Sequence, residues 1–249
     1  MQAYWTLTRR ELAGYFLSLS GYVILGAVMF LTGLSFILLL TGLQKEPTPM
    51  PLTELFYMTP FFWLILLLST PVITMRLFAL EKFSGTFETL MTAPVSDAEV
   101  VLAKFSAGLF FYVVTWLPLV GCLWVVRHYT NDHASLDAGV MASTFAGIFL
   151  LGCLFVSLGC CASALTRSQG VAVMISLLFG VSFFLLSFIA KAAASADWQG
   201  KVLASFALVD QMHDFARGMV DSRPVVFYLT LTGFFLFLTL RIVESRRWK

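Results

Sequence analysis

Residues 20–42 read SGYVILGAVMFLTGLSFILLLTG and contain no charged side chain. An α-helix rises about 1.5 Å per residue, so about 20 apolar residues cross the roughly 30 Å hydrocarbon core of a bilayer. The composition of the whole chain is also apolar in character, because 59% of its 249 residues are apolar and 12% are charged. In soluble domains about 45–50% of the residues are apolar and about 25% are charged. The stretch therefore predicts an integral membrane protein.

Five more apolar runs are long enough to cross the bilayer. None has the alternating pattern of a transmembrane β-barrel strand. Together with the first run they predict an all-α membrane protein with six transmembrane helices in a single domain, residues 1–249. Pro71 and Pro118 lie inside spans and predict kinks there. The first run is too long for the core of a signal peptide and is expected to remain as a span. The five runs are 57–75, 105–126, 139–162, 170–190 and 224–240.

The distribution of basic residues predicts that both termini face the cytosol. In that orientation the cytosolic segments hold ten Lys and Arg residues against six acidic ones, and the external segments hold six against eight. An excess of Lys and Arg marks the cytosolic side of a membrane protein. The clearest cytosolic segments are the two terminal ones, with Arg9 and Arg10 before the first span and a basic cluster from Arg241 to Lys249 after the last.

Residues 4–19 predict an N-terminal interfacial helix. Its aromatic and aliphatic residues can share one broad face opposite a charged cluster, so the helix would lie along the cytosolic leaflet. The alternative is a simple aromatic and basic anchor at the membrane surface. The apolar face holds Tyr4, Trp5, Leu12, Tyr15 and Phe16, and the charged cluster is Arg9, Arg10 and Glu11.

The cytosolic connection 76–104 is longer than a hairpin between two spans requires. Ser84 and Gly85 predict a turn, and residues 86–92 predict a short amphipathic helix. Pro94 ends that helix, and a capping box predicts that a new helix starts at Ser96 and runs into the third span.

The short helix 86–92 has an apolar face made by Phe87, Leu90 and Met91, with Glu88 on another side. An exposed face of this kind fits the groove of a partner protein. The alternative is that the helix rests on the lipid headgroups.

The external connection 191–223 predicts one amphipathic helix or two short ones. Its apolar positions recur at helical spacing and its charged residues take the other side. Such a helix would either line an outer gate or lie at the membrane interface. The apolar positions are Leu208, Met212, Phe215 and Met219, and the charged ones are Asp210, Asp214, Arg217 and Asp221.

Several kinds of chemistry are excluded by what the sequence lacks. It contains no G-x-x-x-x-G-K-[ST] phosphate loop, no H-E-x-x-H and no G-x-S-x-G. Its four cysteines lie in apolar runs without the spacing of a zinc site, and its histidines are expected to be solvated or interfacial residues of external loops. No span carries an ionisable residue well inside it, which argues against an ion gradient and for a separate motor. The histidines are His128, His133 and His213.

The string EKFSGTFETLMTAPVSDAEVVLAKF, residues 81–105, resembles the permease subunits of type-2 ABC exporters, and most of all the gliding-motility-associated branch. The N-terminal RRELAGYF and the C-terminal segment from Asp214 resemble the same branch. Phe83 departs from the family pattern, which is more polar there. The positions that match are Glu81, Gly85, Thr86, Glu88, Leu90, Pro94, Val95 and Ser96.

This resemblance implies that the loop between the second and third spans is a coupling helix that docks on a cytosolic ATPase subunit. Residues 4–19 would be the connecting helix, and 191–223 would form external re-entrant helices. Within 191–223, the external gate helix would carry Leu208, Met212, Phe215 and Met219. The docking residues would be Glu81, Gly85, Thr86, Phe87, Glu88, Leu90, Met91 and Pro94.

The function implied is that of a permease subunit of an ATP-driven exporter in a bacterial inner membrane. The chain itself would be no enzyme and would bind no cofactor, because ATP and Mg²⁺ would be held by the ATPase partner. A second permease subunit, identical or paralogous, would complete the pathway, and no nucleic acid is expected as a partner. The alternative is a non-transporting, force-transmitting scaffold of an envelope machine that works with an extracytoplasmic auxiliary protein.

Overall fold

The computed structural model describes residues 2–45, 52–92, 95–129, 138–192 and 205–245. These residues are nearly all helical, and none of them lies in a strand. The helices are α1 (Gln2–Phe16), α2 (Leu19–Lys45), α3 (Leu52–Met58), α4 (Pro60–Thr74), α5 (Ala79–Ser84), α6 (Thr86–Thr92), α7 (Asp97–Thr115), α8 (Leu117–Tyr129), α9 (Ala138–Leu165), α10 (Gln169–Ala192), α12 (Leu208–Ala216) and α13 (Ser222–Ser245).

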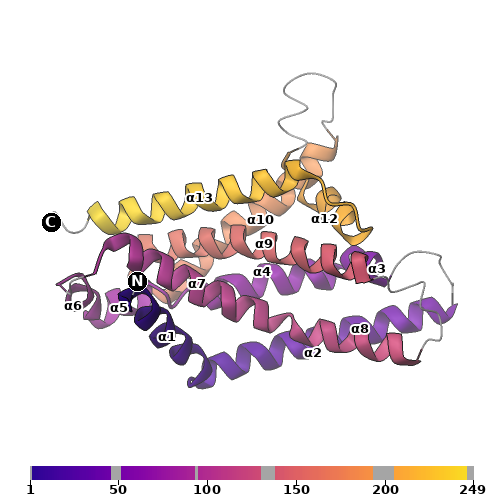
Figure 1. The fold of residues 1–249 in the computed structure, drawn as a ribbon, viewed down its shortest axis with the longest axis horizontal. Coiled ribbons are helices and arrows are strands. Elements are labelled where there is room, and N and C mark those ends of the chain that lie inside the picture. Colours follow the sequence, from indigo (N-terminus) through magenta and orange to yellow (C-terminus); the bar gives the residue numbers. More distant parts are fainter. Residues whose placement is uncertain (1, 46–51, 93–94, 130–137, 193–204, 246–249) are drawn as a thin grey trace.

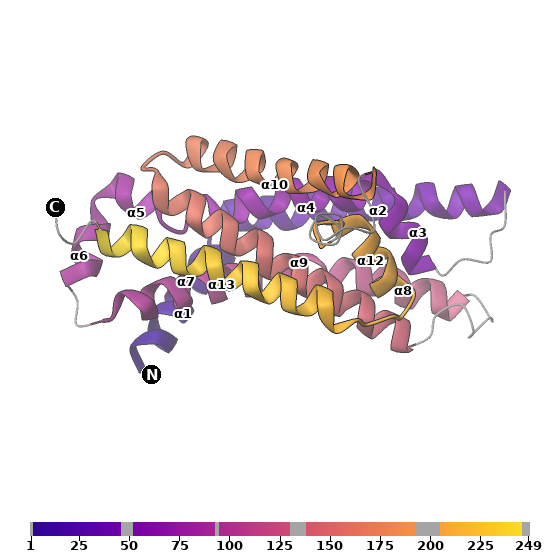
Figure 2. The same ribbon diagram turned by 90° about the horizontal axis from the view of Figure 1, so that it is seen from above.

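Six stretches of the described chain are long and apolar enough to span a membrane, which confirms the predicted all-α membrane fold. The six run roughly along one axis and form an elongated bundle (Figures 1 and 2). Both ends of the chain lie at the end of the bundle that carries α5 and α6, and α3 and α12 lie toward the other end (Figure 1). The stretches are Leu19–Leu43, Pro60–Ser84, Asp97–Val126, Ala138–Leu165, Gln169–Ala190 and Ser222–Ser245.

The second span starts later than expected. It was expected from residue 57, but α3 ends at Met58 and α4 begins at Pro60, because proline suits the first turn of a helix and not its interior. The helix of the third span, α7, begins at Asp97, directly after the Ser96 cap, as the capping box predicts. Its helix breaks at Trp116, directly before the Leu117–Pro118 pair, as the proline predicts.

The fourth span, α9, is the centre of the bundle (Figure 2). In its most apolar stretch 89% of the residues are buried, against 17% in α13 and 22% in α10. It contacts α4, α7, α10, α12 and α13.

Three glycines of α9, Gly147, Gly152 and Gly159, let its neighbours approach closely. A Cβ atom at Gly152 would lie 2.2 Å from the Tyr112 ring, and one at Gly159 would lie 2.1 Å from the Thr74 hydroxyl. Small residues allow such contacts between membrane helices. The polar groups at these contacts are satisfied locally, since the Thr74 hydroxyl donates to the carbonyl of Thr70 at 2.9 Å.

Candidate functional site

The connection between the second and third spans folds as helix, turn and helix, as the sequence predicts. α5 ends at Ser84, and Gly85 takes the left-handed conformation with φ 76°, which glycine adopts without a steric penalty. α6 then ends at Thr92. The predicted capping box is confirmed: the Ser96 hydroxyl accepts from the backbone N–H of Glu99, and the Glu99 carboxylate accepts from that of Ser96.

The apolar face of α6 lies against the chain itself, which corrects the expectation of an exposed Phe/Leu/Met face. Phe87 and Leu90 are only 7% and 8% exposed. The Lys82 ammonium lies 5.2 Å from the centre of the Phe87 ring and donates to the carbonyl of Ala164 in α9. Burial of the two apolar side chains removes them from water at this end of the bundle, where the surroundings are polar.

Other side chains are presented outward at the tip of this segment. Phe83, the position that departs from the related pattern, is 78% exposed. Gly85, Thr86 and Glu88 are exposed as well. The Met91 side chain and the whole of Pro94, two further predicted docking residues, lie outside the described residues.

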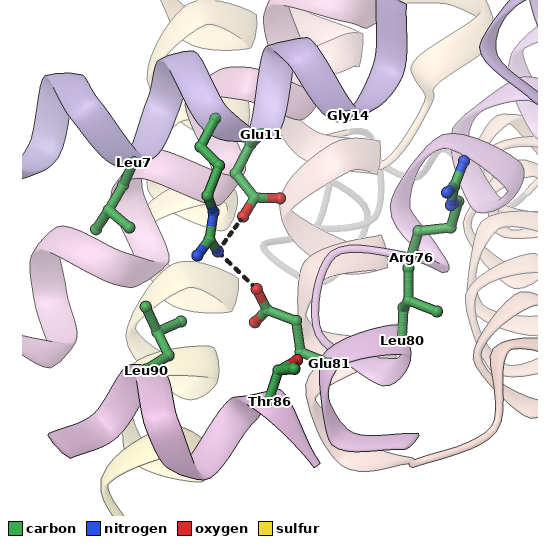
Figure 3. Close-up of a pocket in the computed structure, with 9 residues that line it drawn as sticks. Leu7, Glu11, Gly14, Arg76, Leu80, Glu81, Thr86 and Leu90 are labelled. Carbon is green, nitrogen blue, oxygen red and sulfur yellow. Dashed lines mark hydrogen bonds and ion pairs between the residues drawn. The ribbon is translucent and has the colours of Figure 1, made fainter. Parts of the chain in front are cut away.

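Glu81, which the sequence predicts at the partner contact, is bound within the chain by a ring of four charges. Arg10 Nη2 lies 2.9 Å from Glu11 Oε1 and 2.8 Å from Glu81 Oε1. Lys104 Nζ lies 3.0 Å from Glu11 Oε1 and 3.0 Å from Glu81 Oε2. Figure 3 shows the Glu11 and Glu81 side chains pointing toward each other across the gap between α1 and α5. The four charges alternate in sign and sum to zero.

Lys104 is the most deeply buried member of this charge ring. Its side chain is 2% exposed, while the side chains of Glu11 and Glu81 are each 15% exposed, and its ammonium lies 5.4 Å from the centre of the Phe78 ring. Burial of Glu11 opposes its ionisation, but the positive charges of Lys104 and Arg10 outweigh that cost and hold the pKa of Glu11 below its ordinary value. The ring therefore ties α1, α5 and α7 together electrostatically.

α1 packs on α7 with part of the apolar face that the sequence predicts. Tyr4 bonds the Ser106 hydroxyl at 2.7 Å, and Tyr15 stacks on Phe111 with ring centres 4.7 Å apart. Glu11, expected on the outer charged side, lies on this inward face, while Trp5 is 68% exposed. The aromatic residues of α1 are therefore divided between the protein and its surroundings.

The start of α5 is held by the central helix α9. The Ser163 hydroxyl accepts hydrogen bonds from the backbone N–H groups of Phe78 and Ala79 at 3.1 and 3.0 Å, and it lies 3.1 Å from the carbonyl of Met75, to which it donates. N–H groups at a helix start need such acceptors. A displacement of α5 is therefore passed to α9 as well as to α1 and α7.

A pocket of about 660 Å³ opens between α1, α5 and α6. Its wall combines the exposed side of the charge ring with leucine side chains (Figure 3). Arg76 lies beside Leu80 at one edge of the pocket (Figure 3). The lining residues are Leu7, Arg10, Glu11, Gly14, Arg76, Leu80, Glu81, Thr86 and Leu90.

At the opposite end, α12 is packed into the bundle. Leu208, Met212 and Phe215 are at most 1% exposed, and a Cβ atom at Gly147 of α9 would lie 2.9 Å from the Met212 methyl group. Met219, expected on the same face, is 53% exposed and lies beyond the helix. α12 ends at Ala216 because the chain turns at Gly218, which has φ 86°.

A buried carboxylate that sequence reasoning missed joins α12 to α3. Glu54 is 2% exposed, accepts from Arg217 Nε at 2.9 Å and lies 2.8 Å from Arg217 Nη2. His213 Nδ1 is 3.1 Å from the same Glu54 oxygen, so this histidine is not the solvated loop residue that was expected. The only signal was a single carboxylate in the otherwise uncharged helix LTELFYM.

The described residues form no cluster of three or more His, Cys, Asp or Glu side chains that could hold a metal ion. Cys153, Cys160 and Cys161 are free and buried, and Cys122 is free and half-buried. The charged side chains at the two ends of the bundle, in the charge ring and around Glu54, form ion pairs between helices.

The sequence pattern of a family described as ABC-2 family transporter protein matches residues 49–243, which include all the spans except the first. No curated protein matches the chain. The match does not support the narrower gliding-motility-associated branch.

Proposed function

The chain belongs to the ABC-2 family of transporter proteins and is a permease subunit of an ABC transporter, and we propose that it works as an exporter whose separate cytosolic ATPase docks on α5 and α6. Two copies, or this chain and a paralogue, enclose the pathway in a bacterial inner membrane. Both termini face the cytosol, and the ATPase partner binds ATP and Mg²⁺.

The observation that carries this proposal is the tip of the α5–α6 segment. Phe83 is 78% exposed on a segment whose apolar side chains Phe87 and Leu90 are buried. A single exposed aromatic side chain on a firmly held turn is typical of an interface anchor. The exposed Glu88 beside it adds a negative charge, which a basic residue of the ATPase would complement.

The proposed coupling follows from how this segment is held. A force on the tip reaches α7 and α1 through the charge ring of Arg10, Glu11, Glu81 and Lys104. It reaches α9 through Ser163. Closure of the ATPase subunits would therefore tilt several spans together. In this account Glu81 transmits the movement within the permease, and Phe83 and Glu88 make the contact.

The test is purification of the tagged full chain from its native membrane, followed by ATP hydrolysis measurements in liposomes. An ABC ATPase subunit is expected to co-purify with the wild-type chain. Phe83→Ala is expected to weaken that association by about thirtyfold or more, the loss typical of an aromatic hot spot. Glu88→Lys is expected to weaken it as well. The matched control is Phe234→Ala on α13, where the side chain is 55% exposed far from the tip.

A complex that lacks an ATPase subunit contradicts the proposal. So does an association that Phe83→Ala and Phe234→Ala leave equally strong. If the ATPase binds as expected but its activity moves no candidate substrate across the liposome membrane, the scaffold role with an extracytoplasmic partner, which the gliding-motility branch would imply, replaces the exporter role.

A further inference from the structure

We propose that Arg76, with the hydroxyls of Ser18 and Ser20, binds the phosphate of an anionic phospholipid of the cytosolic leaflet. The orientation of this site rests on the proposed function, which places α5 and α6 in the cytosol. The phospholipid would lie between the start of the first span and the end of the second.

Arg76 lies where the end of α4 meets the start of α2. It follows the end of α4 at Thr74, and its Nη1 donates to the Ser18 hydroxyl at 3.2 Å and also to the Ser20 hydroxyl. Ser18 immediately precedes α2, which begins at Leu19. In the proposed orientation, the start of α2 and the end of α4 would therefore place this guanidinium near the level of the lipid phosphates.

The charge of Arg76 has no counterion among the described residues. The nearby pocket contains two carboxylates, Glu11 and Glu81, but both are engaged by Arg10 and Lys104 in a ring that is neutral by itself. Arg76 bonds only neutral hydroxyls within the described part of the chain. One positive charge is therefore left over on this side of the pocket.

The geometry of the guanidinium suits a phosphate. Both hydrogen bonds of Arg76 use Nη1, so Nε and Nη2 are not engaged by the described residues. Two parallel N–H donors match two oxygens of a phosphate group. The hydroxyls of Ser18 and Ser20 are 3.0 Å apart. The Ser18 hydroxyl donates to the Tyr15 carbonyl at 3.2 Å, so the Ser20 hydroxyl is the one that can turn its proton toward a bound oxygen.

The surroundings favour a lipid over free phosphate. Leu17 and Leu19 flank Ser18 in the sequence and are 85% and 83% exposed. The pocket itself carries leucine side chains, including Leu80, four residues after Arg76. Acyl chains and a glycerol backbone would cover these apolar groups, whereas an inorganic anion would leave them exposed. The ligand that fits both parts is a phosphate diester with hydrocarbon chains.

The close turn between α1 and α2 keeps the two serines in place. A Cβ atom at Gly21 would lie 2.0 Å from the Tyr15 carbonyl oxygen, so the chain can fold back this tightly only with glycine at that position. The Gly21 N–H lies 3.3 Å from the Ser18 hydroxyl oxygen, which accepts from it. The hydroxyl groups are therefore positioned by backbone geometry before any lipid arrives.

The experiment is native mass spectrometry of the full-length chain in detergent, titrated with phosphatidylglycerol, with phosphatidylcholine or with inorganic phosphate. The wild-type chain is expected to retain phosphatidylglycerol in preference to the other two. Arg76→Gln is expected to weaken retention about tenfold, and Arg76→Lys, which keeps the charge but not the two-pronged geometry, by less. The matched control is Arg241→Gln at the same end of the bundle, where Arg241 is already paired with Glu244 at 2.9 Å.

Equal retention by wild type and Arg76→Gln overturns the proposal, as does an equal loss in Arg241→Gln, which would indicate only general attraction to positive charge. Displacement of the lipid by excess inorganic phosphate overturns the lipid assignment in favour of a free anion. If Arg76→Gln does not fold, Arg76→Lys decides the question, because wild-type affinity in that variant contradicts the bidentate site. The ATPase is absent from this measurement, so its result is independent of whether the proposed docking occurs.

Discussion

The ammonium of Lys104 in α7 lies 3.0 Å from the carboxylate of Glu11 in α1, and only 2% of the lysine side chain is exposed. The lysine also faces Glu81 of α5 at 3.0 Å. A cation at this depth is stable because two carboxylates compensate for its lost hydration. This contact explains how an N-terminal helix outside the spans is held to the bundle.

Removal of that cation should destabilise the fold. We expect Lys104→Ala to lower the free energy of unfolding by about 3–5 kcal/mol, because it leaves Glu11 and Glu81 facing each other with Arg10 as their only neighbouring cation. The measurement is reversible unfolding in detergent micelles. Arg241→Ala is the control, and its surface pair should contribute no more than about 1 kcal/mol. Equal effects of the two substitutions would show that the ring adds no stability.

Acid should weaken the same junction. The folded-state pKa of Glu11 lies below the ordinary value of 4.5, so its ionised form stabilises the fold above pH 4.5 and this contribution is lost as the pH falls through the lower, folded-state pKa. We expect the thermal stability of the wild-type chain to fall more steeply below pH 4.5 than that of Glu11→Gln. Parallel pH profiles for the two chains would contradict this assignment.

Close packing at Gly159 should tolerate no added methyl group. Its Cβ would meet the Thr74 hydroxyl at 2.1 Å and Thr74 Cβ at 2.7 Å, and neither atom belongs to a flexible side-chain end. We expect Gly159→Ala to cost about 1–3 kcal/mol through overpacking. Gly33→Ala is the matched control on α2, since nothing lies within 4 Å of its added Cβ, and alanine favours a helix over glycine. Thermal unfolding of both variants checks the difference.

The buried carboxylate at the other end should anchor α12. Glu54→Gln removes the negative charge that Arg217 and His213 approach at 2.8 and 3.1 Å. We expect a loss of about 1.5–3 kcal/mol, typical of hydrogen bonds to a charged group, and faster proteolysis of the α12 region. Glu244→Gln, which alters an exposed pair on α13, should have little effect. Unchanged proteolysis of Glu54→Gln would mean that packing of Met212 and Phe215 alone holds α12.

The features that sequence reasoning predicted are those with local causes. The apolar runs, the turn at Gly85 and the Ser96–Glu99 capping box depend on neighbouring residues, so they can be read from one segment at a time. Apolar periodicity alone predicts that the helix of α12 continues to Met219. In the structure this helix ends before Met219, because Gly218 takes the left-handed conformation.

The sequence by itself determined a six-helix membrane protein with a punctuated loop, because the length of an apolar run and the conformational limits of glycine and proline act locally. Only the tertiary structure decided which faces are buried. Lipid and protein interior are both apolar, so α9 and α13 look alike in the sequence, yet α9 is the core and α13 lies at its edge. Likewise, the sequence does not distinguish Phe87 and Leu90, which are buried, from Phe83, which is exposed. The charge ring joins Glu11, Glu81 and Lys104 from separate segments, and such a meeting depends on how the helices pack rather than on any one of them.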